Sequence, residues 1–578
     1  MAASKRQRPA PAPVSPEPGG WPVWQIALLL LASLFAVFEL YGPALHGPFV
    51  LDDGYQFFGR PDVDRLQLRH WLNNVRPLLN LSFYVNYQFS GTNPFSYHAV
   101  NVLLHWLNSV LVFFILRRLV RASNPVQEAP SGWAAGLAPL AAAALFLLHP
   151  VQTESVAYVS SRSELLSVLP AYAALLLFLS RPAPAISWGR AAVVVALFGC
   201  AVLTKEHTAV LPAVLLLADL CFHPSGPVRG VKANWRLYAP LAAAAVTGLV
   251  FIWKTLSKTK SAGFQLAGLS WHEYFFTQWR MFWRYLRLAL FPAGLNADPD
   301  IALSRTPFEH GAIFYGLALL ALLAAAFLYR RRFPLAAFGI FAFALLLAPT
   351  SSFVPIRDLF AERRLYLPMI GLLCVAVEFL RRLDLRSTPV LAALAALLAA
   401  SSYLAWQRAH VWSGAIPLWQ DTVAKSPNKY RPRFQLAYAL YHADRCPEAA
   451  AQYEQAAALE AEPAENLLVD WSLALDCAGR PADAAAKLEQ AARLHPTAVV
   501  YTNLAMLHGK AGRHEQALEA LSLAERQDPS FAQIYAFRGN IYFAMNRPAE
   551  AAVQYRRALQ IDPANQAAQH GLRALAGQ

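Results

Sequence analysis

The chain has few charged residues and few cysteines for its length. Of its 578 residues, 15% are Asp, Glu, Lys or Arg and 56% are hydrophobic, and the mean hydropathy is +0.31. This composition excludes an ordinary soluble globular protein, in which about 25% of residues are charged. The five cysteines include no CxxC pair, so we expect neither a disulfide framework nor a zinc site.

Acidic residues are also scarce relative to basic ones. There are 36 Asp and Glu residues against 50 Lys and Arg, a net charge of +14. Such an excess can indicate nucleic-acid binding, but here the basic residues gather in short connections between apolar runs. That distribution is typical of membrane orientation. We therefore expect membrane lipid, and no nucleic acid, as a partner.

Eleven apolar runs predict a polytopic, all-α transmembrane bundle over residues 21–411. The first run, about 21–40, is longer than the core of a signal peptide and has no cleavage site of small residues. It follows a flexible basic leader, residues 1–20, which we place in the cytoplasm. The other runs lie at about 97–116, 133–149, 164–180, 190–204, 208–222, 237–253, 311–329, 335–349, 364–380 and 388–406.

Lys and Arg clusters in every second connection fix the predicted sidedness. With an odd number of spans, the first outer loop, 42–96, and the C-terminal domain share the non-cytoplasmic side. The aromatic stretch 271–292 carries Arg280, Arg284 and Arg287 on one helical face. We expect it to form an interfacial helix on the outer membrane surface.

Residues 412–578 contain a repeat. Its marks are four prolines separated by 33, 33 and 34 residues, namely Pro463, Pro496, Pro529 and Pro563. This is close to the 34-residue period of tetratricopeptide repeats, and small residues recur where the helices would touch. We predict about four helical hairpins in a soluble solenoid. Such a surface binds a polypeptide partner, although a scaffold without chemistry of its own fits the repeats equally well.

Asp52 and Asp53 follow the first span closely. Two adjacent carboxylates are costly near hydrocarbon, so they predict a place that water, a cation or a substrate reaches. The alternative is that they only cap a turn as the chain leaves the membrane.

Further polar residues recur at the predicted outer ends of the spans. They are Arg76, His98, His149, Glu154, Arg162, Lys205, Glu206, Glu362, Arg363, Arg364 and Tyr366. Cations and carboxylates together suit a lipid-phosphate substrate, because the cations can bind phosphate and a carboxylate can abstract a proton. Each also has a plainer interpretation. Arg363 and Arg364 could bind lipid head groups, Lys205 and Glu206 could form an interfacial ion pair, and His149 could end a helix.

Several motifs, in this order, resemble those of the transmembrane and tetratricopeptide-repeat-containing O-mannosyltransferases of the GT-C glycosyltransferase superfamily. The motifs are Leu51-Asp52-Asp53, Arg76-Pro77-Leu78, Tyr97-His98-Ala99-Val100-Asn101, His149-Pro150-Val151-Gln152-Thr153-Glu154, Ser161-Arg162-Ser163-Glu164, Lys205-Glu206 and Ala361-Glu362-Arg363-Arg364-Leu365-Tyr366. The resemblance covers nearly the whole chain. Four repeats and an Ala-rich composition indicate a bacterial relative, for which the inner membrane is the expected location.

The resemblance implies transfer of a sugar, mannose in this family, from a polyprenyl-phosphate donor to an acceptor hydroxyl, such as a Ser or Thr of a protein. It makes Asp52 or Asp53 the general base. The implied donor-phosphate ligands are Arg363, Arg364, Lys205 and Arg162. Glu154, Glu206, His149 and Glu362 would orient the site or hold a divalent metal ion, with Arg76, His98 and Tyr366 as further candidates.

Two other functions stay open at this point. One is a GT-C enzyme that glycosylates an envelope lipid or polysaccharide. The other is a non-catalytic membrane scaffold that binds proteins through its repeats.

Overall fold

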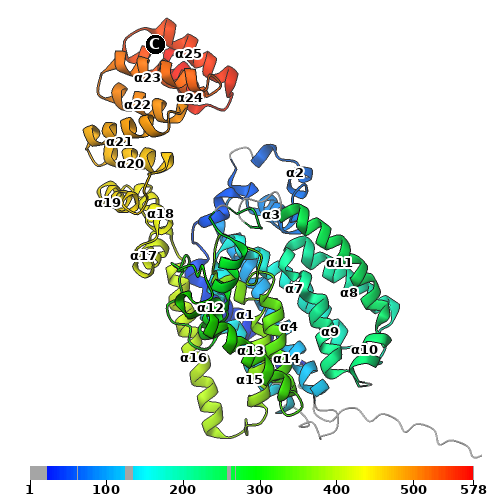
Figure 1. The fold of residues 1–578 in the computed structure, drawn as a ribbon. Coiled ribbons are helices and arrows are strands. Elements are labelled where there is room, and N and C mark those ends of the chain that lie inside the picture. The colour runs from blue at the N-terminus through cyan, green and yellow to red at the C-terminus, as the bar shows by residue number, and fades with distance from the viewer. Residues whose placement is uncertain are drawn as a thin grey trace, which may run out of the picture. The chain divides into compact units, whose positions relative to one another are not determined.

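The computed structural model describes residues 22–60, 63–123, 134–224, 226–256, 262–266 and 268–576 (Figure 1). Within these ranges the only β pairing is one isolated bridge between Ala262 and Ile356, so the predicted all-α class is confirmed. The chain divides into two compact units, Met1–Gly414 and Ala415–Gln578, which we call the membrane unit and the repeat unit. The predicted leader, 1–20, lies outside the described residues.

The membrane unit is a bundle of helices joined by short 3₁₀ turns. Its helices are α1 (Val23–Tyr41), α2 (Leu68–Leu72), α3 (Pro77–Ser90), α4 (Pro94–Ser123), α5 (Ala134–Leu148), α6 (Thr153–Ala157), α7 (Arg162–Leu179), α8 (Trp188–Thr204), α9 (Leu211–Phe222), α10 (Pro227–Ala233), α11 (Trp235–Leu256), α12 (Trp271–Leu290), α13 (Ala312–Leu328), α14 (Pro334–Leu347), α15 (Met369–Leu380) and α16 (Thr388–Val411).

Each predicted span coincides with one of these helices, in order α1, α4, α5, α7, α8, α9, α11, α13, α14, α15 and α16. Among the described residues, five helical segments are long and apolar enough to cross a membrane. The number is six if the bent pair Gly136–Leu148 and Pro150–Ala157 forms one span. A multi-pass membrane protein is therefore confirmed, and the count of eleven stays a prediction. The stretch predicted to lie along the membrane surface forms α12.

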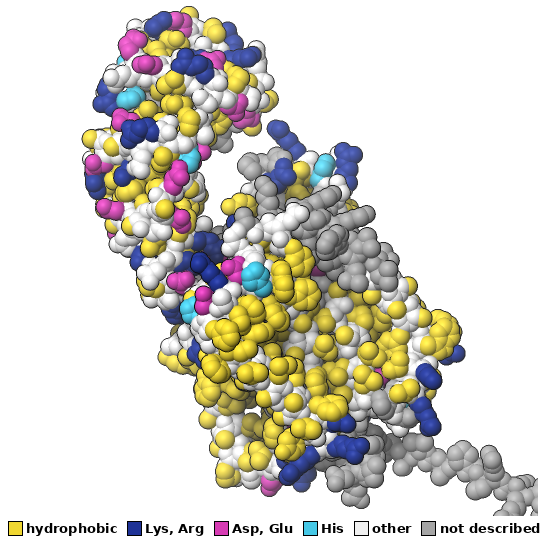
Figure 2. Space-filling model, in the orientation of Figure 1, with side chains coloured by type: hydrophobic (Ala, Val, Ile, Leu, Met, Phe, Trp, Pro, Cys, Tyr) yellow, Lys and Arg dark blue, Asp and Glu magenta, His cyan; other side chains and the backbone are white. Residues whose placement is uncertain are grey.

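Small residues let two of these helices approach closely. A Cβ on Gly339 of α14 would lie 2.3 Å from the carbonyl oxygen of Gly371 in α15, so only glycine fits this crossing. Close approach through small residues is the usual way in which helices associate in lipid. The opposite property marks α1, α13 and α16, whose apolar side chains are mostly exposed, and Figure 2 shows a broad hydrophobic surface over the membrane unit.

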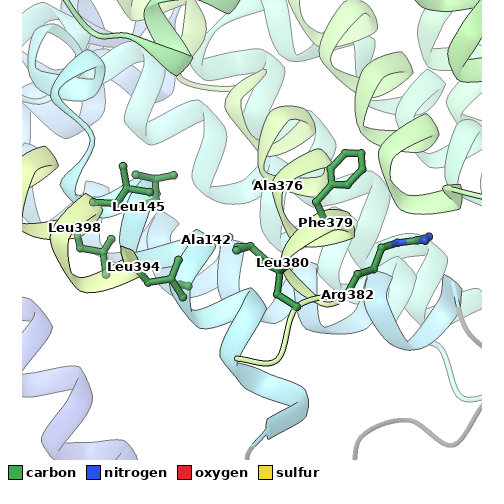
Figure 3. A pocket seen from close by; sticks show the side chains of 11 residues that line it. Ala142, Leu145, Ala376, Phe379, Leu380, Arg382, Leu394 and Leu398 are labelled. Carbon is green, nitrogen blue, oxygen red and sulfur yellow. The ribbon is translucent and has the colours of Figure 1, made fainter. Parts of the chain in front are cut away.

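A cavity of about 420 Å³ lies between α5, α15 and α16. Figure 3 shows that it is lined by apolar side chains such as Leu145, Leu380 and Leu398, with Arg382 beside it. None of the predicted site residues lines this cavity. It therefore plays no part in the candidate site described below.

The repeat unit is a series of antiparallel helical hairpins. Its helices are α17 (Ala415–Lys425), α18 (Tyr430–Tyr441), α19 (Cys446–Ala457), α20 (Glu465–Cys477), α21 (Pro481–Leu494), α22 (Ala498–Lys510), α23 (His514–Gln527), α24 (Ala532–Ala544), α25 (Pro548–Ile561) and α26 (Gln566–Ala576). The pairs from α18–α19 to α24–α25 are the four predicted hairpins, and α26 packs on the last one. A Cβ on Gly539 would lie 2.5 Å from the Tyr555 ring, which explains why a small residue recurs there.

One expectation about the cysteines was wrong. Cys446, at the start of α19, and Cys477, at the end of α20, form a disulfide with their Cα atoms 5.7 Å apart. Because α19 packs against α20, two residues 31 positions apart in the chain meet in space. Cys200, Cys221 and Cys374 are free.

Candidate active site

The two adjacent carboxylates of the first outer loop point in different directions. They lie in a 3₁₀ turn, Leu51–Tyr55, that opens with Leu51 in the left-handed region at φ 54°. A non-glycine residue held at such a φ carries backbone strain and is found preferentially at functional sites. Asp53 is fully buried, whereas Asp52 is exposed.

Asp53 is fixed by hydrogen bonds from two segments. Its Oδ1 accepts from the backbone N–H of Ser160 (2.8 Å) and from the Ser160 hydroxyl (2.6 Å), and its Oδ2 accepts from the backbone N–H of Val50 (3.0 Å). Burial raises the pKa of Asp53 to about 7, against the opposing effect of these hydrogen bonds. Asp53 therefore ties the first outer loop to the turn Val159–Ser161.

The exposed Asp52 is positioned through its backbone. Its N–H donates to the Tyr158 hydroxyl (3.0 Å), and the guanidinium of Arg363 lies 5.7 Å from the centre of the Tyr158 ring. Tyr158 thus connects the loop that carries Asp52 with the loop that carries Arg363. The Asp52 carboxylate itself is left facing solvent, as a base that accepts a proton from a substrate must be.

Arg363 is held by a buried carboxylate. Glu154 has a fully buried side chain, forms an ion pair with Nη1 of Arg363, and accepts its backbone N–H (3.0 Å). Asp358 lies 3.9 Å from Nη2 of Arg363. Within the described residues, neither Nε nor Nη2 of Arg363 donates a hydrogen bond, and the side chain is 21% exposed. Arg363 is therefore anchored and still has donors to offer.

A second charged group lies around the turn Glu206–Val210. Arg76 makes two parallel hydrogen bonds to Glu206, of 3.0 and 2.9 Å. Lys205 forms an ion pair with Glu164 and donates to the Ser163 hydroxyl (3.2 Å). The suggested Lys205–Glu206 ion pair is therefore wrong, because neighbouring residues point in different directions and each found a distant partner.

Arg76, Lys205 and Arg363 belong to one cluster. Burial lowers the pKa of Lys205 to about 8, and the positive charges of Arg76 and Arg363 add to this effect, while Glu164 opposes it. The Arg76 side chain is 40% exposed, and its Nη1 donates no hydrogen bond within the described residues. We call these three side chains the cation cluster. Unused N–H donors on several cations are what a phosphate requires.

Two of the predicted phosphate-binding arginines are occupied by other groups. Arg162 is fully buried and donates to Asn101 (3.0 Å), Asn86 (2.8 Å) and the carbonyl of Tyr97 (3.0 Å). Arg364 donates to the backbone carbonyls of Asp358 and Thr350, at 2.7 and 3.3 Å. Their guanidinium groups join segments of the bundle.

The remaining predicted residues are likewise bonded within the fold. His149 accepts the N–H of Val151 on Nδ1 (3.2 Å), as a helix cap does, and its Nε2 bonds the Ala289 carbonyl (3.1 Å). Buried Glu362 accepts the backbone N–H of Asn296. Buried His98 and Tyr366 bond Gly47, His105 and Asn108.

No group of three or more His, Cys, Asp or Glu side chains in the described part of the chain is placed to hold a metal ion. Nothing in this arrangement therefore requires a metal for the cation cluster to act on a phosphate.

Sequence reasoning missed Tyr158 and Ser160. Both are common residue types in an unremarkable stretch, and their importance comes from contacts with residues more than 100 positions away. The one available signal is that they lie between the Glu154 and Arg162 motifs.

The comparisons with known proteins support the two-part organisation. The tetratricopeptide-repeat family model matches residues 498–531 and 532–565, which are the last two hairpins. The repeat protein YrrB overlaps 31% of this chain and 89% of its own, with 18% identity and a TM-score of 0.24, values too low to support any comparison.

Curated relatives extend the match into the membrane unit. Protein O-mannosyl-transferase Tmtc1 of Drosophila melanogaster is 37% identical over 167 residues, covering 28% of this chain and 17% of the relative. TMTC1 of Mus musculus is 33% identical over 171 residues, covering 27% and 16%. TMTC3 of Mus musculus is 24% identical over 547 residues, covering 85% of this chain and 57% of the relative. The matched regions thus span less than two thirds of each relative. The resemblance predicted from the motifs is confirmed, and the chain is a relative of the transmembrane and tetratricopeptide-repeat-containing protein O-mannosyl-transferases.

Proposed function

We propose that this protein is a membrane glycosyltransferase that moves mannose from a polyprenyl-phosphate donor to a Ser or Thr hydroxyl of a protein. The observation that carries the proposal is the separation of the aspartate pair beside the cation cluster. Asp52 is exposed and Asp53 is buried as its anchor. The names of the relatives, which are protein O-mannosyl-transferases, favour this reaction and acceptor.

In the proposed reaction Asp52 accepts the proton of the acceptor hydroxyl as its oxygen attacks the anomeric carbon. The bond between that carbon and the donor phosphate breaks, and polyprenyl phosphate leaves with an additional negative charge. Arg76, Lys205 and Arg363 stabilise this charge, because guanidinium and ammonium donors strengthen their hydrogen bonds as the phosphate becomes more negative. Glu154, Glu164 and Glu206 position the three cations.

The reaction is proposed for the non-cytoplasmic side, with the repeat unit in the same compartment. The Cys446–Cys477 disulfide supports this placement, because disulfides persist in oxidising compartments and are rare in the cytosol. The repeat unit would then raise the local concentration of a polypeptide acceptor. α12, with its arginines bonded to the loop at Ala302–Ser304, is proposed to lie along the same membrane surface.

The decisive experiment measures mannose release from polyprenyl-phosphate mannose by the purified protein in lipid, with a Ser/Thr-containing acceptor. We expect Asp52→Asn to lower the rate about 100-fold or more, the usual contribution of a general base. Asp53→Asn should retain part of the activity, since its role is positioning. The control Asp64→Asn removes an exposed carboxylate from the same outer loop and should leave the rate unchanged.

Three outcomes would change the conclusion. A wild-type rate for Asp52→Asn would rule out this residue as the base. Transfer to envelope lipid or polysaccharide, with none to protein, would replace the acceptor class. A wild-type protein that is inert with every polyprenyl-phosphate sugar would make a protein-binding scaffold the better description.

A further inference from the structure

Three tyrosines surround one carboxylate at the start of the repeat unit. Tyr430 and Tyr438 lie on α18, Tyr453 lies on α19, and Asp470 lies on α20, which packs against both other helices. Burial and the nearby charge of Asp470 raise the pKa values of all three tyrosine hydroxyls. The four side chains therefore face one another, and we call them the tyrosine pocket.

The polar atoms of this pocket have no partners of their own. Asp470 is half-buried and makes neither a hydrogen bond nor an ion pair within the described residues, and burial raises its pKa to about 6. The hydroxyls of Tyr430 and Tyr453 are buried without a hydrogen-bond partner, and the whole Tyr453 side chain is inaccessible. Buried polar groups are nearly always paired in folded proteins, so the pocket is built for a group that is supplied from outside.

We propose that the tyrosine pocket binds the positively charged side chain of a Lys or Arg in a polypeptide partner. Asp470 supplies the counter-charge, and the hydroxyl oxygens of Tyr430 and Tyr453 accept N–H groups. Tyrosine ring faces attract cations as well. The ring of Tyr438, 44% exposed, forms the entrance.

The charges around the pocket favour a cation over an anion. The nearest additional charge that acts on Tyr430 is that of Glu460, which is also negative. One turn further along the repeat unit, the same chemistry is already satisfied internally, since the ammonium of Lys487 lies 3.8 Å from the centre of the Trp471 ring. The chain thus covers its own Trp471 with a lysine and leaves Asp470 without one.

The pocket is also held in shape before any partner arrives. The Cys446–Cys477 disulfide joins α19 to α20, and the Phe434 ring packs between those of Tyr430 (5.8 Å) and Tyr453 (5.7 Å). A preformed site loses less conformational entropy on binding. A polypeptide is the favoured source of the cation, because stacked helical repeats offer an extended surface beside the pocket.

The test uses the full-length protein in maltoside detergent, without lipid or sugar donor, and fluorescence anisotropy of two labelled peptides. One peptide repeats Gly-Ser-Lys, and its control repeats Gly-Ser-Gln. We expect the lysine peptide to bind at least about tenfold more tightly, the effect of one charged hydrogen bond. Asp470→Asn should abolish the difference, whereas Glu519→Gln, which removes an exposed carboxylate from α23, should preserve it.

A second variant guards against misfolding. Tyr438→Leu changes an exposed side chain, should leave thermal unfolding unchanged, and should weaken binding of the lysine peptide severalfold. Equal binding of both peptides, or lysine-peptide binding that survives Asp470→Asn, would overturn the proposal. The inference does not depend on the proposed transferase reaction, and Asp52→Asn should bind the lysine peptide as the wild type does.

Discussion

Ion pairs in the membrane unit mostly join distant segments, whereas most of those in the repeat unit join neighbours on one helix. Arg363 reaches Glu154 and Lys205 reaches Glu164, and both carboxylates are almost completely buried. In the repeat unit, Arg445 pairs with Glu448 three residues later, and the pattern recurs in later hairpins with both side chains exposed. Identical residue types therefore do different work, because solvent screens the second kind of pair and not the first.

The comparison is tested most severely by breaking a buried pair. Arg363→Gln should destabilise the membrane unit by about 3–5 kcal/mol, because it leaves the Glu154 carboxylate buried and unpaired. The measurement is the temperature at which buried Cys374 of α15 becomes reactive toward a fluorogenic thiol reagent, with Cys200 and Cys221 replaced by Ser. Arg433→Gln, in the repeat unit, serves as the control. An unchanged reaction temperature for Arg363→Gln would contradict the argument.

The covalent link of the repeat unit comes next in expected size. Replacing Cys446 and Cys477 by Ser should destabilise the first two hairpins by about 3 kcal/mol, the stabilisation expected for a loop of this length. Hydrogen-exchange mass spectrometry of the full chain should show faster exchange in α18 to α21 and no change in α4 or α7. Equal protection in the oxidised wild type and the variant would show that packing alone holds these hairpins.

The third prediction concerns pH and the cation cluster. Because burial lowers the pKa of Lys205 to about 8, this side chain loses its positive charge as the pH rises above that value. At pH 9 about one tenth of the molecules keep the charge, so the KM for the polyprenyl-phosphate donor should rise about tenfold between pH 7 and 9. Lys205→Arg should flatten this rise, because arginine stays charged. A rise of the same size in the arginine variant would assign the effect to another group.

The smallest effect is expected for an exposed pair. Glu448→Gln removes the partner of Arg445 on the surface of α19, where water solvates both groups. Hydrogen exchange of α19 should match the wild type. Measurable destabilisation would show that exposed pairs in this unit contribute more than their solvation suggests.

Periodicity in the sequence predicted the helices of both units. Apolar runs gave helices at all eleven expected places, and the prolines marked the four hairpins, because helix formation and repeat stacking follow local patterns. The direction of a single side chain does not. Which of Asp52 and Asp53 would be exposed depends on Tyr158 and Ser160, and the partners of Arg76 and Lys205 depend on how distant turns meet. The Cys446–Cys477 disulfide was missed for the same reason, since it forms between hairpins.

The anchoring of the first outer loop has a consequence for biosynthesis. Asp53 and Asp52 are held by Ser160 and Tyr158, which follow them by 107 and 106 residues in the chain. A ribosome makes the aspartates first, and the loop that carries them crosses the membrane before its anchors exist. The loop can reach its final conformation only after α4 and α5 have been inserted and the turn before α7 has arrived. The newly made chain therefore has no assembled centre during its early passage through the translocation machinery, and its maturation is completed by a later segment.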